Sequence, residues 1–132
     1  MKIVLDANIL IAFSNTGHIF HANSIGILGQ PNSVFLIHRL TLAEYLVHPA
    51  RLGIARDALR IVRDDLMITS PDPEDIENDE FALELADVRA TTGLRMPDAV
   101  ILATARRVQA KVATFDESLL SAATAEGRAF NS

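Results

Sequence analysis

The sequence predicts an α/β domain built around a mainly parallel sheet. Short apolar runs of strand type alternate along the chain with segments of helical periodicity. The segments between strands are long enough for parallel crossover connections, which need a dozen or more residues. Because 132 residues can bury one hydrophobic core but not two, we expect a single domain over residues 1–132.

The first half of the chain contains two predicted strands and two predicted helices. Residues 2–5 form the first apolar run of strand type, and residues 9–13 continue as a helical segment. A second strand is predicted at residues 33–37, after a Gln-Pro-Asn turn. A helix is expected at residues 41–47, and Pro49 is expected to help end it.

The middle of the chain is predicted to be mostly helical. Residues 54–63 have helical periodicity, and residues 66–69 form a short apolar run of strand type. The turn sequence Ser-Pro-Asp-Pro at residues 70–73 leads into a long helix that ends near Gly93. The apolar positions of this helix recur at spacings of four and three: Phe81, Leu85 and Val88.

The last third of the chain repeats the helix-and-strand alternation. A helix is predicted at residues 99–108, opening near Pro97, because proline is well placed where a helical N–H has no partner. Residues 111–115 are predicted to form a strand, and residues 116–123 a further helix. Residues 127–130 are expected to add an edge strand.

The composition narrows the type of protein and of metal site. The absence of cysteine excludes disulfides and thiolate metal ligands, and it fits the reducing setting of the cytoplasm, where we expect the protein. His18 and His21 have no further His or Cys grouping, so we expect no zinc site.

Asp6 and Asn8 interrupt the apolar N-terminal run, which argues against a signal peptide. No apolar stretch approaches the roughly 20 residues that span a bilayer, so we expect no membrane segment.

The net charge of −5 does not exclude a nucleic-acid partner, because the acids are unevenly distributed. Six of the 17 acids fall within residues 72–80, where a solvated helix start favoured by the helix dipole is expected. Without that block the chain carries 11 acids and 12 bases. The remainder is therefore close to neutral and can present a local basic face.

Four acids occupy similar places in the predicted fold. Asp6 and Asp116 each follow a strand, whereas Glu44 and Asp98 each lie in the first turn of a helix. In an open parallel sheet the carboxyl ends of the strands and the following helix starts line one crevice. Four carboxylates in one crevice repel one another, so a fold tolerates them when a cation or shared protons neutralise the charge.

Each acid also has a simpler interpretation as a helix cap. An Asp at a helix start accepts backbone N–H bonds and complements the helix dipole. The segment from Thr41 to Glu44 has the spacing of a capping box. The prediction of a site therefore depends on the convergence of the four acids and not on any one of them.

A hard divalent cation is the natural occupant of such a cluster. Mg²⁺ prefers oxygen ligands and is typically held by one or two carboxylates together with water and substrate phosphate oxygens. This arrangement suits phosphodiester hydrolysis, in which the metal activates a water molecule and stabilises the leaving oxygen. Asn8 and Thr114 are predicted to orient the carboxylates or metal-bound waters, with a turn former and a strand residue as the alternative interpretations.

Four segments, in order, resemble a known family. They are Ile-Val-Leu-Asp-Ala-Asn-Ile-Leu at 3–10, Leu-Ala-Glu-Tyr-Leu at 42–46, Pro-Asp-Ala-Val-Ile-Leu-Ala-Thr-Ala at 97–105 and Val-Ala-Thr-Phe-Asp at 112–116. Together they are similar to the PIN-domain ribonucleases, especially the VapC toxins of VapBC toxin–antitoxin pairs. The matching segments extend over nearly the whole chain.

The resemblance implies a three-layer α/β/α fold with a central, mainly parallel sheet. It also implies a Mg²⁺- or Mn²⁺-dependent endoribonuclease that cleaves single-stranded RNA, forms a homodimer and is inhibited by a cognate antitoxin in the active-site groove. By motif position the catalytic acids are Asp6, Glu44, Asp98 and Asp116, and the first, third and fourth of these hold the metal, with Thr114 beside them. Asn8 departs from the pattern, which more usually has Thr or Ser there.

Three other functions compete with this interpretation. A haloacid-dehalogenase-like phosphatase also places an aspartate after its first strand, but it needs a second acid at the position of Asn8 and a downstream lysine. The chain has only Lys2 and Lys111, the former before the strand. A phospho-acceptor regulator needs paired acids after that strand, where this chain offers one. A non-catalytic module would bind the metal structurally and dock a partner.

Several arginines are candidates for RNA contact. Arg56, Arg60 and Arg63 recur at helical spacings and form a possible basic stripe, although neighbouring acids favour an ordinary solvated face. Arg39 and Arg95 lie close in sequence to predicted site acids. Each is expected either to meet substrate phosphate or to pair with an acid.

Overall fold

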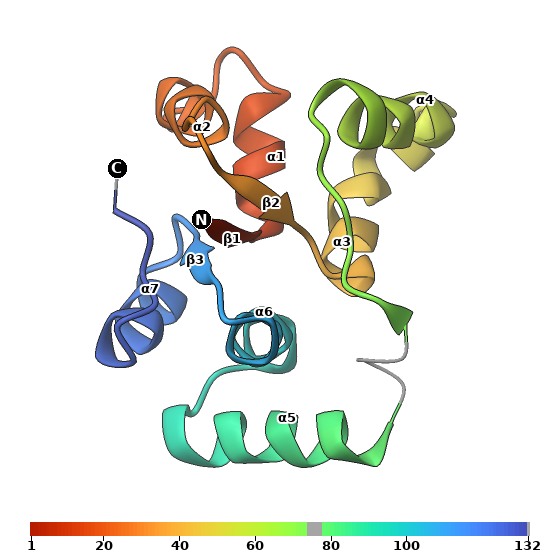
Figure 1. Cartoon of the computed structure of the whole chain (residues 1–132). Coiled ribbons are helices and arrows are strands. Elements are labelled where there is room, and N and C mark those ends of the chain that lie inside the picture. Colours follow the sequence, from red (N-terminus) through yellow and green to blue (C-terminus); the bar gives the residue numbers. More distant parts are fainter. Residues whose placement is uncertain (74–77, 132) are drawn as a thin grey trace.

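A three-stranded parallel sheet lies at the centre of the computed structural model, which describes residues 1–73 and 78–131. The strands are β1 (Lys2–Leu5), β2 (Val34–Leu36) and β3 (Lys111–Ala113), in the order β2-β1-β3 (Figure 1). Ile3 of β1 lies opposite Phe35 on one side and Lys111 on the other. The predicted α/β class with a parallel sheet is confirmed.

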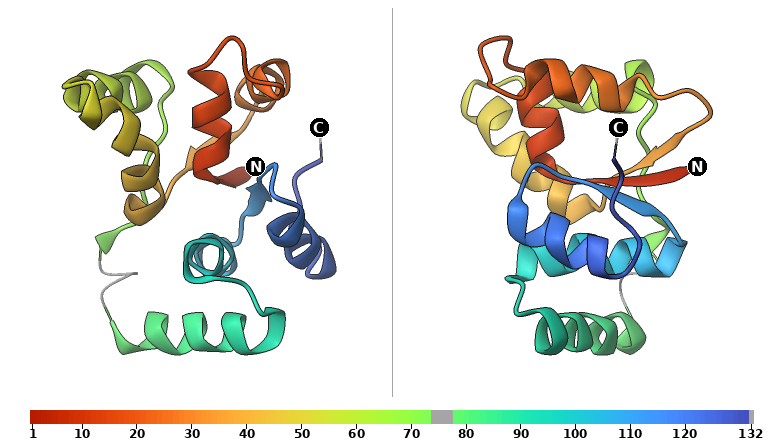
Figure 2. Two further views of the ribbon diagram at one scale, coloured as in Figure 1. Left: turned by 180° about the vertical axis from the view of Figure 1, so that it is seen from behind. Right: turned by 90° about the vertical axis from the view of Figure 1, so that its left-hand side faces the viewer.

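Helices cover both faces of this sheet (Figures 1 and 2). Their bounds, including one π-helical turn η1, are α1 (Ala7–Phe13), α2 (His21–Leu28), α3 (Arg39–Arg51), α4 (Ala55–Arg60), η1 (Ile61–Asp65), α5 (Asp79–Thr92), α6 (Met96–Val108) and α7 (Glu117–Ala125). Helices α1 and α2 lie on one face, and α6 and α7 lie on the other. Helix α5 packs on α6 from outside, and the result is the expected three-layer arrangement.

The alternation of side chains along β1 explains the two halves of the core. Ile3, Val4 and Leu5 are all fully buried, which is typical of a strand covered on both faces. Ile3 and Leu5 pack with residues of α1, α2 and β2, whereas Val4 packs with residues of α5, α6 and α7. The central strand is therefore fixed from both sides, and its carboxyl end is held in place.

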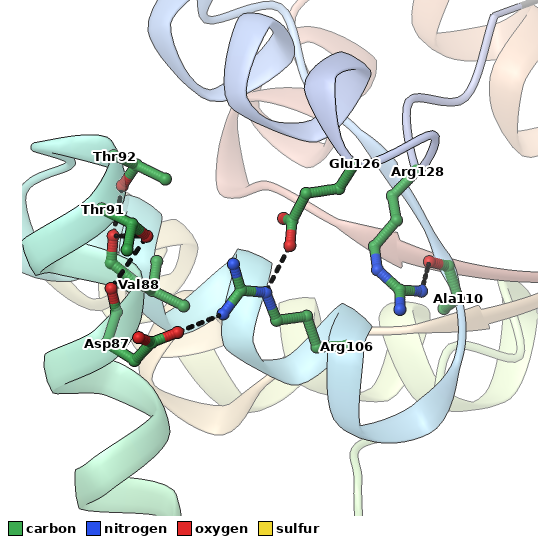
Figure 3. Close-up of polar contacts among 8 residues, drawn as sticks. All are labelled: Asp87, Val88, Thr91, Thr92, Arg106, Ala110, Glu126 and Arg128. Carbon is green, nitrogen blue, oxygen red and sulfur yellow. Dashed lines mark hydrogen bonds and ion pairs between the residues drawn. The ribbon is translucent and has the colours of Figure 1, made fainter.

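Helix α6 crosses beneath the sheet and carries a continuous buried stretch from Ala99 to Ala105. In its last turn, Arg106 donates from Nε to Glu126 Oε1 at 2.5 Å and from Nη1 to Asp87 Oδ2 at 3.2 Å (Figure 3). These bonds link α6 to α5 and to the residue that ends α7. The C-terminal end of α6 is thus bonded to α5 and to the end of α7.

Two of the observed helices differ from the sequence prediction. Helix α3 begins at Arg39, because the Nδ1 atom of His38 accepts the Leu40 N–H at 3.0 Å and caps the helix there. It continues to Arg51 with Pro49 inside it, so the prediction that Pro49 ends the helix near residue 47 is wrong. Burial of the Pro49 ring helps to offset the backbone hydrogen bond that proline cannot make. Helix α2 was not predicted, because Gly26 within residues 21–28 and Gly29 directly after them weaken the helical pattern.

Other boundaries agree with the predictions more closely. Helix α5 is capped at its start by Asn78 and ends at Gly93, whose φ of 73° is the left-handed conformation that favours glycine.

Residues 66–69 and 127–130 each contribute a single parallel bridge, at Thr69 and Ala129, in place of the expected strands. Part of the predicted acidic helix start, residues 74–77, lies outside the described residues. Within the described ranges no helix has the length and apolar character needed to cross a membrane.

Candidate active site

The four selected acids lie at or near the ends of elements that meet at the carboxyl edge of the sheet. Asp6 directly follows β1 and precedes α1, and Asp116 occupies the N-cap of α7 beyond β3. Asp98 is in the first turn of α6. Glu44 is in the second turn of α3, because that helix begins earlier than the sequence suggested.

Asp6 is the most deeply buried of these acids, with only 7% of its surface exposed. It occupies the N-cap position of α1, but its side chain makes no capping hydrogen bond. Instead, the Thr114 hydroxyl donates to Asp6 Oδ2 at 2.7 Å. Burial raises the pKa of Asp6, while the Thr114 hydroxyl and nearby backbone N–H groups act in the opposite direction. The cap interpretation therefore does not account for this carboxylate.

Thr114 is the centre of a small hydrogen-bond network at this edge. Its hydroxyl oxygen accepts from Asn8 Nδ2 at 3.3 Å and from the Asp116 N–H at 3.0 Å. Asn8 Oδ1 in turn accepts the Phe115 N–H at 3.4 Å. With both acceptor positions of the hydroxyl in use, its proton is directed at Asp6. Asn8 and Thr114 thus connect α1 to the turn that carries Asp116.

Asp98 shows most clearly that the acids act on one another. Its pKa is raised from 3.8 to about 6, first by desolvation and then by the charges of Asp116 and Asp6, with a smaller contribution from Glu44. The guanidinium of Arg95 acts in the opposite direction. All three other site acids therefore lie close enough to disfavour the ionised form of Asp98.

Asp116 combines a capping bond with a position in an open groove. Its Oδ2 atom accepts the Leu119 N–H at 2.9 Å, so the cap interpretation applies to this residue. A carboxylate has a second oxygen with its own acceptor capacity. Asp116 and Asp98 both line a groove of about 490 Å³, which they share with Arg95 and Glu117. The arrangement leaves room for a substrate beside two of the acids.

Glu117 and Ser118 were missed by the sequence analysis. Both line the same groove as Asp98 and Asp116. The available signal was their position immediately after Asp116, at the start of a predicted helix. The solvated face of a helix start offers the same sequence pattern, so this signal is weak.

Glu44 faces a neighbouring groove between α1 and α3, which it shares with Tyr45 and Ser14. Desolvation raises its pKa, and the charge of Asp6 adds to the rise. The predicted capping box is wrong: Thr41 is buried within α3, and His38 caps the helix instead. Glu44 is therefore within electrostatic reach of Asp6.

The donor set fits a hard cation better than zinc. Its members offer carboxylate oxygens, the ligands that Mg²⁺ takes together with water and phosphate oxygens. In the described part of the chain no three His, Asp or Glu side chains form a ready-made metal-ligand group. A site completed by water and substrate does not require one. His18 Nδ1 accepts the Phe20 N–H, and His21 Nδ1 contacts the Ala12 carbonyl, so each imidazole has one ring nitrogen engaged within the fold.

The predicted arginine stripe is interrupted. Arg63 donates to the Ile68 carbonyl and to Ser70 Oγ, so its guanidinium is engaged within the fold. Arg60 pairs with Asp57 in the same helix at 3.4 Å, as the solvated-face interpretation expects. Of the arginines close in sequence to the acids, Arg95 lines the groove, whereas Arg39 donates to a backbone carbonyl at residue 71.

Comparisons with known proteins give a consistent result. A family model described as the PIN domain matches residues 3–125. No curated protein sequence matches the chain. Similar solved structures include the Mycobacterium tuberculosis toxin VapC20, described as cleaving the sarcin–ricin loop, with a TM-score of 0.69 and 19% identity over 91% of this chain and 94% of that one.

Two complexes are also similar in fold. VapBC2 of Rickettsia felis, bound to a promoter DNA fragment, has a TM-score of 0.63 and 18% identity, covering 88% of each chain. A toxin–antitoxin complex from Klebsiella pneumoniae has a TM-score of 0.63 and 21% identity, covering 86% of each chain. At these identities the structures establish a shared fold.

Proposed function

The chain belongs to the PIN domain family, and on this premise we propose that it is a metal-dependent endoribonuclease that cleaves single-stranded RNA. The observation that carries the proposal is the mutual effect of four carboxylates at the carboxyl edge of the sheet. Burial raises the pKa of Asp98 to about 6, and the charges of Asp116, Asp6 and Glu44 add to the rise. Repulsion among carboxylates disfavours the fold, whereas a bound cation relieves it.

Asp6, Asp98 and Asp116 are the residues that would hold Mg²⁺ or Mn²⁺, with Glu44 on the adjacent groove. When bound, the cation supplies Lewis-acid stabilisation of the phosphate and a lowered pKa for a coordinated water. The Thr114 hydroxyl fixes one oxygen of Asp6, and the Leu119 N–H fixes one oxygen of Asp116. Both carboxylates are thus oriented before substrate arrives, which reduces the reorganisation that catalysis requires.

Arg95 is the cationic side chain in the groove with Asp98 and Asp116. Its charge opposes the rise in the Asp98 pKa, so it lies within electrostatic reach of that acid. We assign it the role of meeting a substrate phosphate, since a guanidinium can bind two phosphate oxygens at once. It also reduces the repulsion that the acids exert on the RNA backbone.

The fold neighbours support a toxin role as part of the proposal. The three similar structures are a toxin and two toxin–antitoxin assemblies by their descriptions. We therefore propose that this chain is the toxin of such a pair, acts in the cytoplasm as a homodimer, and is inhibited by a cognate antitoxin. Co-expression with the protein encoded by an adjacent gene, followed by co-purification and a loss of cleavage, tests the partner.

The test of the catalytic proposal compares three substrates: single-stranded RNA, single-stranded DNA and a generic phosphomonoester. Each is incubated with Mg²⁺, Mn²⁺ or EDTA and with wild type, Asp98→Asn or the control Asp65→Asn, an exposed acid outside the site. We expect metal-dependent RNA cleavage that Asp98→Asn abolishes and Asp65→Asn leaves intact. Hydrolysis of the monoester without RNA cleavage would overturn the proposal. A metal-induced rise in melting temperature without any hydrolysis would favour the binding module.

The phosphatase alternative receives no support from the site. It requires an acid at position 8, where the Asn8 amide instead bonds both Thr114 and the Phe115 N–H. Family membership points in the same direction.

A further inference from the structure

Two phenylalanines are stacked at the turn that leads into Asp116. Phe20, from the loop between α1 and α2, lies over Phe115 with 4.5 Å between ring centroids and 15° between ring planes. Phe115 lies between Thr114 and Asp116 in the sequence, so one ring of the pair is anchored in the turn that carries the site. The pair therefore forms an aromatic surface that includes the chain neighbour of Asp116.

Phe20 is unusual among the aromatic side chains of the protein. The chain has six Phe, one Tyr and no Trp, all within the described residues. Among these seven side chains Phe20 is the most exposed, with 37% of its surface accessible to solvent. Its aromatic neighbour Phe115 is half-buried and also borders a hollow of about 210 Å³ with Asn23 and Ile27 of α2. Open space thus exists beside the Phe115 ring.

The loop that presents Phe20 is held in place by its own hydrogen bonds. His18 Nδ1 accepts the Phe20 N–H at 3.0 Å, and the imidazole lies 6.0 Å from the Phe20 ring centroid. His21 Nδ1 contacts the Ala12 carbonyl at 2.9 Å, which ties the far end of the loop to α1. An aromatic surface fixed in this way binds a planar partner with little loss of conformational freedom.

We infer that the Phe20–Phe115 stack is a nucleobase-binding subsite, on which an unpaired base of the RNA strand stacks. A neighbouring phosphate of the same strand then occupies the groove lined by Asp98 and Asp116. Every base has an aromatic face, so stacking holds single strands regardless of sequence. A base paired in a duplex is not free to stack in this way. The inference rests on the proposed ribonuclease function and adds a substrate-binding residue to it.

The negative charge of the site favours an RNA contact that does not involve charged groups. Asp98 and Asp116 repel the phosphate backbone, and Arg95 is the cation that lines the groove with them. Stacking on Phe20 adds affinity that does not depend on neutralising this charge. Stacking also restricts the position of the adjacent phosphate, because the base is then held on the Phe20 ring.

The test compares Phe20→Leu, which keeps an apolar side chain but removes the aromatic face, with Phe20→Trp, which keeps the face. Leu83→Ala, at an exposed position on the outer helix α5, is the control. Melting temperatures establish that each variant is folded. The substrates are a short single-stranded RNA and a set of the same RNA, each with one abasic nucleotide at a different position.

For Phe20→Leu we expect KM to rise by roughly 5- to 150-fold, the range for one base–aromatic stack, with kcat nearly unchanged. Phe20→Trp and Leu83→Ala should retain the wild-type KM. In the wild type an abasic nucleotide at one or two positions should raise KM similarly, and in Phe20→Leu the same abasic positions should have no further effect.

Binding supplies a readout independent of cleavage. RNA carrying 2-aminopurine at the sensitive position should lose fluorescence on binding to Asp98→Asn, and this quenching should disappear in the double variant with Phe20→Leu. Cleavage by wild type with equal KM for Phe20→Leu, or abasic effects that persist in full in that variant, would overturn the subsite. A folded wild type that cleaves no RNA would instead overturn the ribonuclease proposal.

Discussion

Replacing Asp98 by Asn should stabilise the metal-free protein while abolishing its activity. In the folded protein the pKa of Asp98 is raised from 3.8 to about 6, so its ionisation opposes folding. That rise corresponds to about 3 kcal/mol if taken in full. Because Asp98 is only half-buried, solvent screening reduces this to about 1–2 kcal/mol. Asn has nearly the same shape and no charge, so it removes the repulsion.

The expected gain is visible in melting temperature. For a domain of this size, 1–2 kcal/mol corresponds to a rise of about 3–8 °C, measured by calorimetry at pH 7.5 in EDTA. A raised carboxyl pKa favours folding in full below pH 3.8, and this contribution is lost as the pH rises through about 6. The advantage of Asp98→Asn should therefore be largest above pH 6 and shrink by roughly two thirds at pH 4.5.

Three observations would contradict this reasoning. Asp98→Asn could melt at or below the wild-type temperature in EDTA at pH 7.5, or its advantage could be the same at pH 4.5. The control Asp65→Asn, at an exposed acid outside the site, could show an equal gain. Added Mg²⁺ gives a further check, because it should raise the melting temperature of wild type more than that of the variant.

Further predictions concern positioning and stability. Thr114→Val should lower the rate of RNA cleavage by roughly 10- to 100-fold, whereas Thr114→Ser, which keeps the hydroxyl, should restore most of it in the same assay. Glu44→Gln should lower cleavage without reducing helix content by circular dichroism, because Glu44 does not cap α3. Arg106→Ala should lower stability in urea titrations by about 1 kcal/mol and leave cleavage by the folded protein unchanged, since its partners Asp87 and Glu126 lie away from the acids.

The sequence predicted the three strands of the sheet and the position of the acids at its edge because both follow from burial. An apolar run such as residues 2–5 is covered on both faces, and the polar residue that ends it, Asp6, must then lie at the carboxyl edge. The same logic placed Asp116 beyond β3. Topology alone brings these two residues together, so no knowledge of side-chain contacts was required.

Helix α3 shows where this kind of reasoning fails. Its start depends on the imidazole of His38 acting as a cap, and its end depends on a buried Pro49 that is tolerated inside the helix. Both are outcomes of tertiary packing that override local preference. The shift of the helix start moved Glu44 from the first turn to the second and so removed its cap interpretation.

The aromatic pair was not predicted either, for a related reason. Phe20 and Phe115 are separated by 94 intervening residues, and nothing in either local sequence indicates that the rings meet. The contact depends on the path of a loop fixed by His18 and on the turn after β3. Contacts between two irregular segments are the least accessible to periodicity, since neither segment has a repeating pattern.

Capping and catalysis are compatible roles at position 116. A cap needs one oxygen, and Asp116 uses Oδ2 for it. An Asn or Ser would cap a helix about as well without adding charge, whereas the Asp116 carboxylate raises the pKa values of Asp98 and Asp6. The charge at this position thus disfavours the metal-free fold and is not needed for the helix. The capping bond fixes the orientation of the carboxylate, and the repulsion that remains is the one a bound cation would relieve.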